Sequence, residues 1–244
     1  MKGSLCIAGL GPGNEDLVTP EVRSALASAT DVLGYTPYCA RVERRPGLEI
    51  HASDNREELQ RARAALELAA SGRHAVVVSS GDPGVFAMAA AVFEALEGNV
   101  AWHQIDIRVL PGVTAMLAAA ARAGAPLGHD FCAINLSDNL KPWSVIEKRL
   151  RLAAEADFAI ALYNPRSASR PEGFGNAMAI LAASGAGNRL VVLARAVSSP
   201  NEKISVMPLR DVDPAMVDMR TLVIVCNSAT RRAGRWIYAP RCAS

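Results

Sequence analysis

Three short loops rich in glycine and proline have the clearest chemical meaning in this chain, and each follows an apolar run typical of a buried strand. The loops are Gly9–Gly13, Ser79–Gly84 and Pro111–Thr114, after the runs Leu5–Ala8, Ala75–Val78 and Ile105–Leu110. In an open α/β sheet, ligands bind outside the carboxyl ends of the strands. Glycine also lets the backbone approach a ligand closely. The loops therefore predict a small-molecule site built largely from backbone groups.

Asp82 is the ionisable side chain best placed for chemistry, because it lies at a strand end between Gly81 and Pro83. A carboxylate there could bind polar groups of a ligand or help to move a proton. An aspartate in such a turn can instead accept a hydrogen bond from its own backbone. Both interpretations of Asp82 remain open at this point.

The spacing Gly9-x-Gly11-x-Gly13 also resembles a dinucleotide-binding loop, but its surroundings argue against that function. Thr19-Pro20-Glu21 has the N-cap and first-turn proline of a helix start, several residues beyond the glycines. A helix beginning there cannot place its N-terminus on a pyrophosphate. Asp31 precedes the second predicted strand, whereas a ribose-binding acid should follow it, and Pro12 lacks an amide donor.

Cysteine and histidine patterns indicate neither a disulfide framework nor a metal site. No C-x-x-C pair occurs among the cysteines, which are Cys6, Cys39, Cys132, Cys226 and Cys242. No two histidines have metal-ligand spacing; they are His51, His74, His103 and His129. The sequence also lacks an obvious Ser-His-Asp, Cys-His or paired-carboxylate arrangement for nucleophilic or acid–base catalysis. We therefore predict no bound metal.

Composition is that of a soluble globular protein. The 244 residues are 50% hydrophobic and 20% charged, with a formal net charge of +2. A charge this small argues against a nucleic-acid partner, and no apolar stretch approaches the length of a membrane span. The first residues read as a strand rather than a signal peptide, so a cytoplasmic location is expected. The basic residues are mostly arginine, a side chain that binds planar carboxylates in a bidentate manner.

The elements predicted from periodicity and turn residues give an α/β protein with two domains. One helix is expected to begin at Pro20. Further helices are expected at Ser53–Ser71, Val85–Leu96, Thr114–Ala123, Trp143–Ala154 and Gly173–Ala183. Besides the three runs above, strands are expected at Val32–Tyr35, Phe131–Leu136, Phe158–Tyr163, Leu190–Ala194, Lys203–Val206 and Leu222–Cys226. The first sheet should be mostly parallel and the second mixed, because its last strands have little helix between them. We place the domains at 1–112 and 113–244 and expect a partly mobile tail after Arg231.

Three ordered motifs resemble those of the tetrapyrrole methyltransferases, and the resemblance covers nearly the whole chain. The motifs are Gly9-Leu10-Gly11-Pro12-Gly13 with Leu17-Val18-Thr19, Ser80-Gly81-Asp82-Pro83-Gly84-Val85-Phe86, and Pro111-Gly112-Val113-Thr114-Ala115. Two further segments are similar to those of family members that act in cobalamin synthesis and couple methylation to contraction of the macrocycle. These segments are Val32–Tyr38 and Leu162–Ser167.

The resemblance implies two α/β domains with a cofactor cleft between them, a homodimer, and S-adenosylmethionine as methyl donor, with S-adenosylhomocysteine as its product. Carried over by motif, the cofactor-binding residues are Pro12, Gly81, Asp82, Phe86, Thr114, Ala115, Tyr163, Asn164, Ala196 and Val197. Asp82 is also the candidate catalytic residue.

The expected substrate is a tetrapyrrole edged with carboxylates, for which charge-assisted arginine contacts are suitable. Substrate-binding candidates near strand ends are Tyr35, Arg166, Asp138 and Arg195, with Arg41 and Arg170 as further arginines in such loops. Alkylation of an electron-rich tetrapyrrole carbon needs alignment of donor and acceptor rather than a dedicated strong base.

Several alternatives remain open. Within the family, the chain could methylate uroporphyrinogen III, or it could methylate a corrin precursor at a different ring carbon. A corrin substrate could be metal-free or contain cobalt. Outside that chemistry, it could methylate RNA or protein on the same fold, or bind the donor as a regulatory module without turnover.

Overall fold

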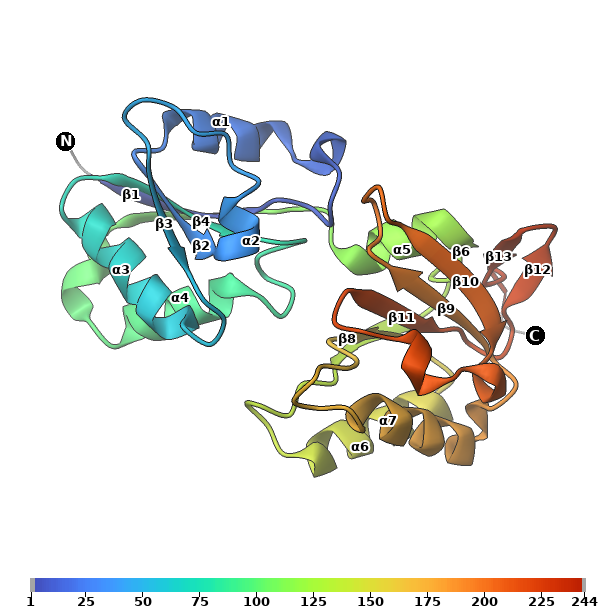
Figure 1. The fold of residues 1–244 in the computed structure, drawn as a ribbon. Coiled ribbons are helices and arrows are strands. Elements are labelled where there is room, and N and C mark those ends of the chain that lie inside the picture. Colours follow the sequence, from blue (N-terminus) through green and yellow to red (C-terminus); the bar gives the residue numbers. More distant parts are fainter. Residues whose placement is uncertain (1–2, 243–244) are drawn as a thin grey trace. The chain divides into compact units, whose positions relative to one another are not determined.

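The computed structural model describes residues 3–242, and these divide after Thr114 into two compact units (Figure 1). The sequence-based division lies two residues earlier in the chain. Each unit has its own hydrophobic core and its own five-stranded sheet. No helix within residues 3–242 is long and apolar enough to cross a membrane.

The first unit contains an entirely parallel sheet in the order β3-β2-β4-β1-β5. Its strands are β1 (Ser4–Gly9), β2 (Asp31–Tyr35), β3 (Glu49–Ser53), β4 (His74–Ser79) and β5 (Asp106–Leu110). Its α-helices are α1 (Pro20–Ser28), α2 (Thr36–Cys39), α3 (Glu58–Ala70) and α4 (Met88–Glu97). Strand β3 and the short helix α2 were not predicted from the sequence.

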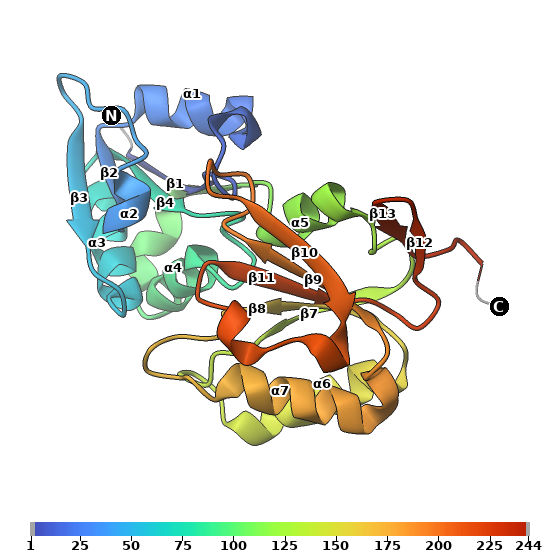
Figure 2. The ribbon, with the colours of Figure 1, turned by 45° about the vertical axis from the view of Figure 1, so that its right-hand side comes forward.

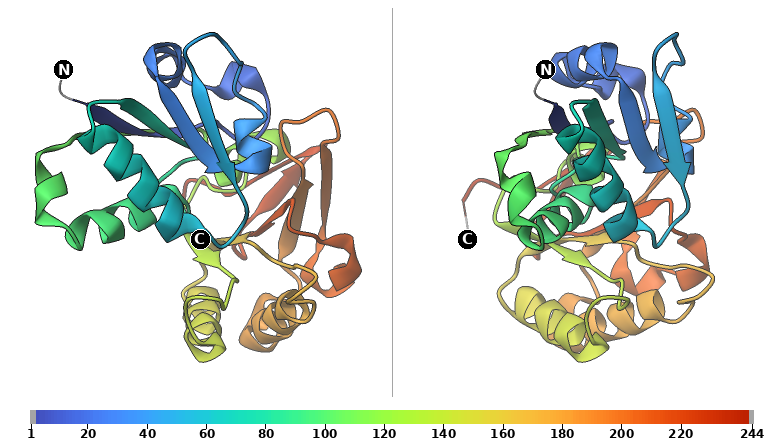
Figure 3. Two further views of the ribbon diagram at one scale, coloured as in Figure 1. Left: turned by 60° about the vertical axis from the view of Figure 1, so that its left-hand side comes forward. Right: turned by 90° about the vertical axis from the view of Figure 1, so that its left-hand side faces the viewer.

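Helices cover both faces of this sheet, which explains why its central strands are continuous apolar runs. Helices α3 and α4 pack side by side over one face, where Leu66 and Val92 are fully buried (Figure 3). Helix α1 covers the other face, where Val22 is fully buried. The Thr19 hydroxyl caps α1 by accepting a hydrogen bond from the amide of Val22, as the sequence predicts.

The second unit contains a mixed sheet in the order β10-β9-β11-β8-β7, in which β7 and β8 are parallel and the other neighbours antiparallel. Its strands are β7 (Phe131–Asn135), β8 (Ala159–Tyr163), β9 (Leu190–Arg195), β10 (Lys203–Pro208) and β11 (Thr221–Val225). Helices α6 (Trp143–Glu155) and α7 (Gly173–Leu181) lie side by side on one face, and α5 (Ala115–Ala123) contacts β9, β10 and β11 (Figure 2). This arrangement confirms the predicted fold class.

Part of the tail after Arg231, which we expect from the sequence to be partly mobile, forms regular structure. Residues Arg231–Ala233 (β12) and Trp236–Tyr238 (β13) form a hairpin, and β13 also pairs with β6 (Gly124–Ala125). Ile237 is fully buried. A short hairpin with one buried apolar side chain gives little periodic signal, which is why sequence reasoning missed it.

Candidate functional site

Two of the predicted loops in the first unit are joined by backbone hydrogen bonds. They follow β1 and β4, which are neighbours in the sheet, so both emerge at the same edge. The Gly11 amide donates to the Gly81 carbonyl at 3.2 Å, and the Gly81 amide donates to the Gly11 carbonyl at 2.9 Å. The Leu10 amide donates to the Ser79 carbonyl at 2.8 Å. These hydrogen bonds join the two loops into one platform whose shape is set by main-chain atoms.

The third loop packs against this platform so closely that only glycine fits at two positions. A Cβ added to Gly112 would lie 2.2 Å from the Gly81 carbonyl oxygen, and one added to Gly9 would lie 2.6 Å from the same oxygen. Both distances are far shorter than van der Waals contact, and the obstructing atom is backbone. The glycines of this edge are therefore required by the packing of its loops.

Asp82 connects two of the three loops through its carboxylate. Its Oδ1 accepts a hydrogen bond from the Gly84 amide at 2.8 Å, and its Oδ2 accepts one from the Gly112 amide at 3.0 Å. The hydrogen bond with Gly84 is the local turn contact that was one of the two interpretations of Asp82 in the sequence. The hydrogen bond with Gly112 joins Asp82 to the loop after β5. Both carboxylate oxygens thus hold the loop geometry.

Three predicted cofactor-binding residues have left-handed backbone conformations. Phe86, Asn164 and Ala196 have φ angles of +53°, +50° and +49°. Such conformations cost roughly 1–3 kcal/mol each for most residues other than glycine, less for asparagine, and cluster at functional sites. Phe86 also exposes 46% of its surface although it is a large apolar side chain.

At the carboxyl edge of the second unit, Tyr163 ends β8 and Asn164 follows it, and both are held by specific hydrogen bonds. The Tyr163 hydroxyl accepts from the Met116 amide in the first turn of α5 at 3.2 Å. The Asn164 Nδ2 donates to Asn135 Oδ1 at 3.1 Å, and the same oxygen accepts from the Ser137 amide at 2.9 Å. Asn135 was missed in the sequence, although a polar residue closing an apolar strand could have identified it.

Lys141 is a second polar residue at this edge that sequence reasoning did not select. Its Nζ donates to the Asn135 carbonyl oxygen at 2.7 Å. Partial burial lowers the pKa of Lys141, and the charge of Arg149 lowers it further. The ammonium group therefore helps to fix the end of β7.

The remaining cofactor candidates lie at or near the same sheet edges. Pro12 belongs to the first loop, and Thr114 is the buried last residue of the first unit. Ala115 begins α5. Val197 follows Ala196 beyond the end of β9, and both are buried.

Two of the substrate-binding candidates are arginines with partners inside the second unit. Arg166 donates to the carbonyl oxygens of Pro171 at 3.2 Å and Pro214 at 3.5 Å. Arg195 Nε donates to Asp218 Oδ2 at 2.9 Å, while about a third of the arginine side chain stays exposed. Arg195 thus keeps an accessible charged surface at the end of β9.

In the first unit, the Tyr35 ring meets the Tyr38 ring edge-on, with centroids 5.3 Å apart. Arg41 donates to the carbonyl oxygens of Leu10 at 2.6 Å and Gly11 at 3.1 Å, and it pairs with Glu15. Arg41 therefore supports the first glycine loop.

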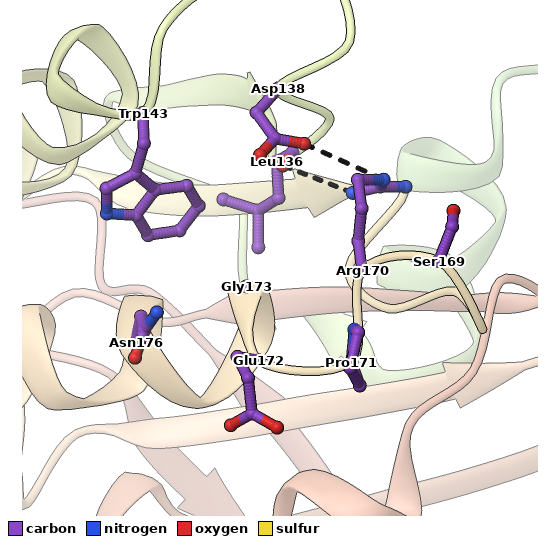
Figure 4. A pocket seen from close by; sticks show the side chains of 9 residues that line it. All are labelled: Leu136, Asp138, Trp143, Ser169, Arg170, Pro171, Glu172, Gly173 and Asn176. Carbon is purple, nitrogen blue, oxygen red and sulfur yellow. Dashed lines mark hydrogen bonds and ion pairs between the residues drawn. The ribbon is translucent and has the colours of Figure 1, made fainter.

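Asp138, Arg170 and Trp143 line a pocket of about 220 Å³ in the second unit (Figure 4). The pocket also includes Leu136, Ser169, Pro171, Glu172, Gly173 and Asn176. Small-molecule sites commonly have volumes of roughly 300–1,000 Å³. This pocket is too small to enclose a tetrapyrrole.

Asp31 lies at the amino end of β2, which confirms the argument against dinucleotide binding. It is fully buried, and Arg73 Nε donates to its Oδ2 at 2.6 Å while Arg73 Nη2 donates to its Oδ1 at 3.1 Å. Burial alone would raise the pKa of Asp31, but hydrogen bonds from Arg73, His51 and Thr30 lower it to about 2. Its carboxylate is therefore an internal ion-pair partner and not a ribose ligand.

Hydrogen-bonded glycine loops at the carboxyl edge of the parallel sheet in the first unit lie where α/β proteins commonly bind small molecules. The chain belongs to the tetrapyrrole (corrin/porphyrin) methylases, whose family model matches residues 4–213.

Relatives similar over nearly their whole length have related names. A precorrin-3B C(17)-methyltransferase from Sinorhizobium sp is 52% identical, with 99% of this chain and 97% of the relative covered. A probable cobalt-factor III C(17)-methyltransferase from Salmonella typhimurium is 40% identical, with 97% and 98% covered. The crystal structure of the methyltransferase CobJ is 63% identical, with a TM-score of 0.96 and coverage of 98% of this chain and all of that one.

Proposed function

We propose that this chain is a precorrin-3B C17-methyltransferase of cobalamin biosynthesis. It transfers a methyl group from S-adenosylmethionine to C17 of precorrin-3B, and the macrocycle contracts to give precorrin-4. The observation that carries this proposal is the 52% identity to the Sinorhizobium relative over nearly the full length of both chains. The Salmonella relative, at 40% identity, makes cobalt-factor III the second candidate substrate.

The charge of the glycine loops fits a sulfonium cofactor better than a phosphorylated one. Among the residues of Gly9–Gly13, Ser79–Gly84 and Pro111–Thr114, Asp82 is the single charged side chain. A negative charge there favours a cationic ligand and disfavours a pyrophosphate. Arg41 lies nearby, but its charge is offset by its ion pair with Glu15.

S-adenosylmethionine, when bound, supplies an electrophilic methyl group on sulfur. The contribution of the first unit is to hold it: we assign binding to Pro12, Gly81, Asp82, Phe86 and Thr114. The hydrogen-bonded loops keep their backbone groups in place before binding, which reduces the ordering cost of association. Phe86 offers exposed apolar surface for contact with the ligand.

In the second unit we assign cofactor binding to Ala115, Tyr163, Asn164, Ala196 and Val197. The Met116 amide fixes the Tyr163 hydroxyl, and the Asn135 side chain fixes the Asn164 amide. Methyl transfer depends on close alignment of donor and acceptor. Residues held by several hydrogen bonds suit that requirement.

We assign substrate contacts to Tyr35, Arg166, Asp138 and Arg195. Arg195 is the strongest candidate for a substrate carboxylate, because its guanidinium combines exposure with a fixed orientation set by Asp218. We also propose that the protein is a homodimer in the cytoplasm. Sedimentation velocity on the purified protein tests the dimer, and fractionation of producing cells tests the location.

The reaction is tested by incubating the purified protein with S-adenosylmethionine labelled with ¹³C in its methyl group. Precorrin-3B and cobalt-factor III are supplied in parallel, and products are analysed by mass spectrometry and NMR. We expect one labelled methyl group at C17 and a contracted ring from precorrin-3B. Preferential conversion of cobalt-factor III would replace the proposed substrate, and cofactor binding with neither substrate converted would overturn the proposed activity.

A further inference from the structure

We propose that Arg170 is a positioning residue that fixes the Tyr163–Asn164 segment for cofactor binding, and not a ligand of substrate carboxylates. The inference rests on the proposed function, because it assigns Arg170 to the same cofactor site. It departs from the sequence-based expectation, which placed Arg170 among the arginines available to a carboxylated substrate.

The guanidinium of Arg170 joins the ends of two neighbouring strands. Its Nη1 donates to the Leu136 carbonyl oxygen after β7 and to the Asn164 carbonyl oxygen after β8, both at 3.3 Å. Figure 4 shows the side chain reaching toward Leu136 and Asp138 from the loop before α7. Since β7 and β8 are parallel neighbours, this bridge sets the spacing of the two chain segments that leave the sheet there.

The other nitrogens of the guanidinium also have partners within the same unit. Nε lies 3.9 Å from Asp138 Oδ1, and Nη2 donates to the Met219 sulfur at 3.6 Å. Only 12% of the side chain is exposed. Its Nη1 group is engaged by two carbonyl oxygens, the Asp138 carboxylate lies beside Nε, and little of the side chain is exposed. A substrate carboxylate would therefore meet the like charge of Asp138 and would disturb the carbonyl contacts.

Asn164 forms a turn directly after β8 that two side chains hold. Its φ of +50° is left-handed, a conformation that asparagine adopts more readily than most residues, and it turns the chain away from the strand direction. Asn135 holds the side chain and Arg170 holds the carbonyl oxygen. Loss of the second contact should let Asn164 relax and move Tyr163, its neighbour.

Arginine suits this position because its planar group offers several donors in a fixed geometry. Lysine has one ammonium on a flexible stem and can replace part of the bridge. The loop is itself closed by backbone hydrogen bonds between Ser167 and Arg170, at 3.1 and 3.4 Å, which aim the side chain back at the strand ends.

The test compares Arg170→Met and Arg170→Lys with a matched control, Arg189→Met. Arg189 is 9% exposed in the same unit, where it donates to the Ala154 carbonyl at 2.8 Å and pairs with Asp157. The control removes a buried arginine that contacts a carbonyl oxygen and a carboxylate at the end of helix α6. Calorimetry with S-adenosylhomocysteine gives affinity, thermal unfolding gives stability, and hydrogen exchange without ligand reports on residues 163–170.

We expect both methionine variants to lower the melting temperature, but only Arg170→Met to weaken S-adenosylhomocysteine binding, by about tenfold, as for loss of one charge-assisted hydrogen bond. Arg170→Lys should recover part of that affinity. Arg170→Lys should also show faster hydrogen exchange than the wild type at residues 163–170. This variant keeps the test valid if Arg170→Met does not fold.

Affinity within twofold of wild type in both Arg170 variants, with unchanged exchange at residues 163–170, would overturn the positioning role alone. Failure of the wild-type protein to bind S-adenosylhomocysteine would instead overturn the proposed function, and the role of Arg170 with it.

Discussion

Replacing Asp82 by asparagine separates two functions that its position allows, structural support of the loops and proton transfer. The carboxylate accepts hydrogen bonds from the amides of Gly84 and Gly112. Asparagine keeps one acceptor oxygen and places an amide donor where the second oxygen was. Because Gly84 is exposed and Gly112 is half-buried, we expect the remaining oxygen to serve Gly112 while water serves Gly84.

The expected magnitudes follow from these two hydrogen bonds. Asp82→Asn should lower the free energy of unfolding by about 1 kcal/mol, the usual net value of one hydrogen bond. Asp82→Ala loses both charge-assisted contacts and should lower it by about 2–3 kcal/mol. If the loops must be ordered to bind the cofactor, affinity for S-adenosylhomocysteine should fall about fivefold in the first variant and at least tenfold in the second.

The assay combines urea denaturation, calorimetry with S-adenosylhomocysteine and turnover at saturating S-adenosylmethionine. Asn99→Ala is a suitable control, because Asn99 accepts a similar local hydrogen bond from the Ala101 amide elsewhere in the first unit. That control should lose stability without losing affinity. An Asp82→Asn variant that binds like wild type yet does not turn over would refute structural support as the role of Asp82 and favour proton transfer.

Two further predictions concern the first unit. Gly112→Ala should abolish measurable S-adenosylhomocysteine binding, because its Cβ would lie 2.2 Å from the Gly81 carbonyl oxygen. The control Gly98→Ala should bind normally, because the atom nearest to its Cβ would be 3.5 Å away. Calorimetry compares the affinities of the two variants. Because the pKa of Asp31 is lowered from 3.8 to about 2, its ion pair with Arg73 stabilises the protein above pH 4, and this contribution should disappear as the pH falls toward 2. Asp31→Asn should lack that acid-dependent loss in urea titrations, and an unchanged pH dependence would contradict the assignment.

Much of the fold could be predicted because its central strands are apolar runs bounded by glycine and proline. Strands β1 and β4 are buried on both faces, so their sequences are continuous and recognisable. Strand β3 was missed for the opposite reason. It lies at the sheet edge and is mostly exposed, and its sequence Glu-Ile-His-Ala-Ser has little apolar periodicity.

The candidate site could be predicted only in part, because local patterns identify loops but not the partners of side chains. The glycine loops were found from their position after apolar runs, and two of them are joined directly by hydrogen bonds. The contacts of Arg170 with Leu136 and of Asp82 with Gly112 join residues about thirty positions apart. Such contacts depend on strand order, which spacing along the chain does not specify.

Strand β1 is an interior strand of its sheet, which has a consequence for synthesis of the protein. Its residue Ser4 pairs with His74 on one side and Asp106 on the other. A nascent chain emerges N-terminus first, so β1 leaves the ribosome with neither neighbour available. At least one edge of the apolar segment Leu5–Ala8 stays unpaired until about a hundred further residues have been translated. During that time the segment is exposed to aggregation, the hazard against which chaperones act.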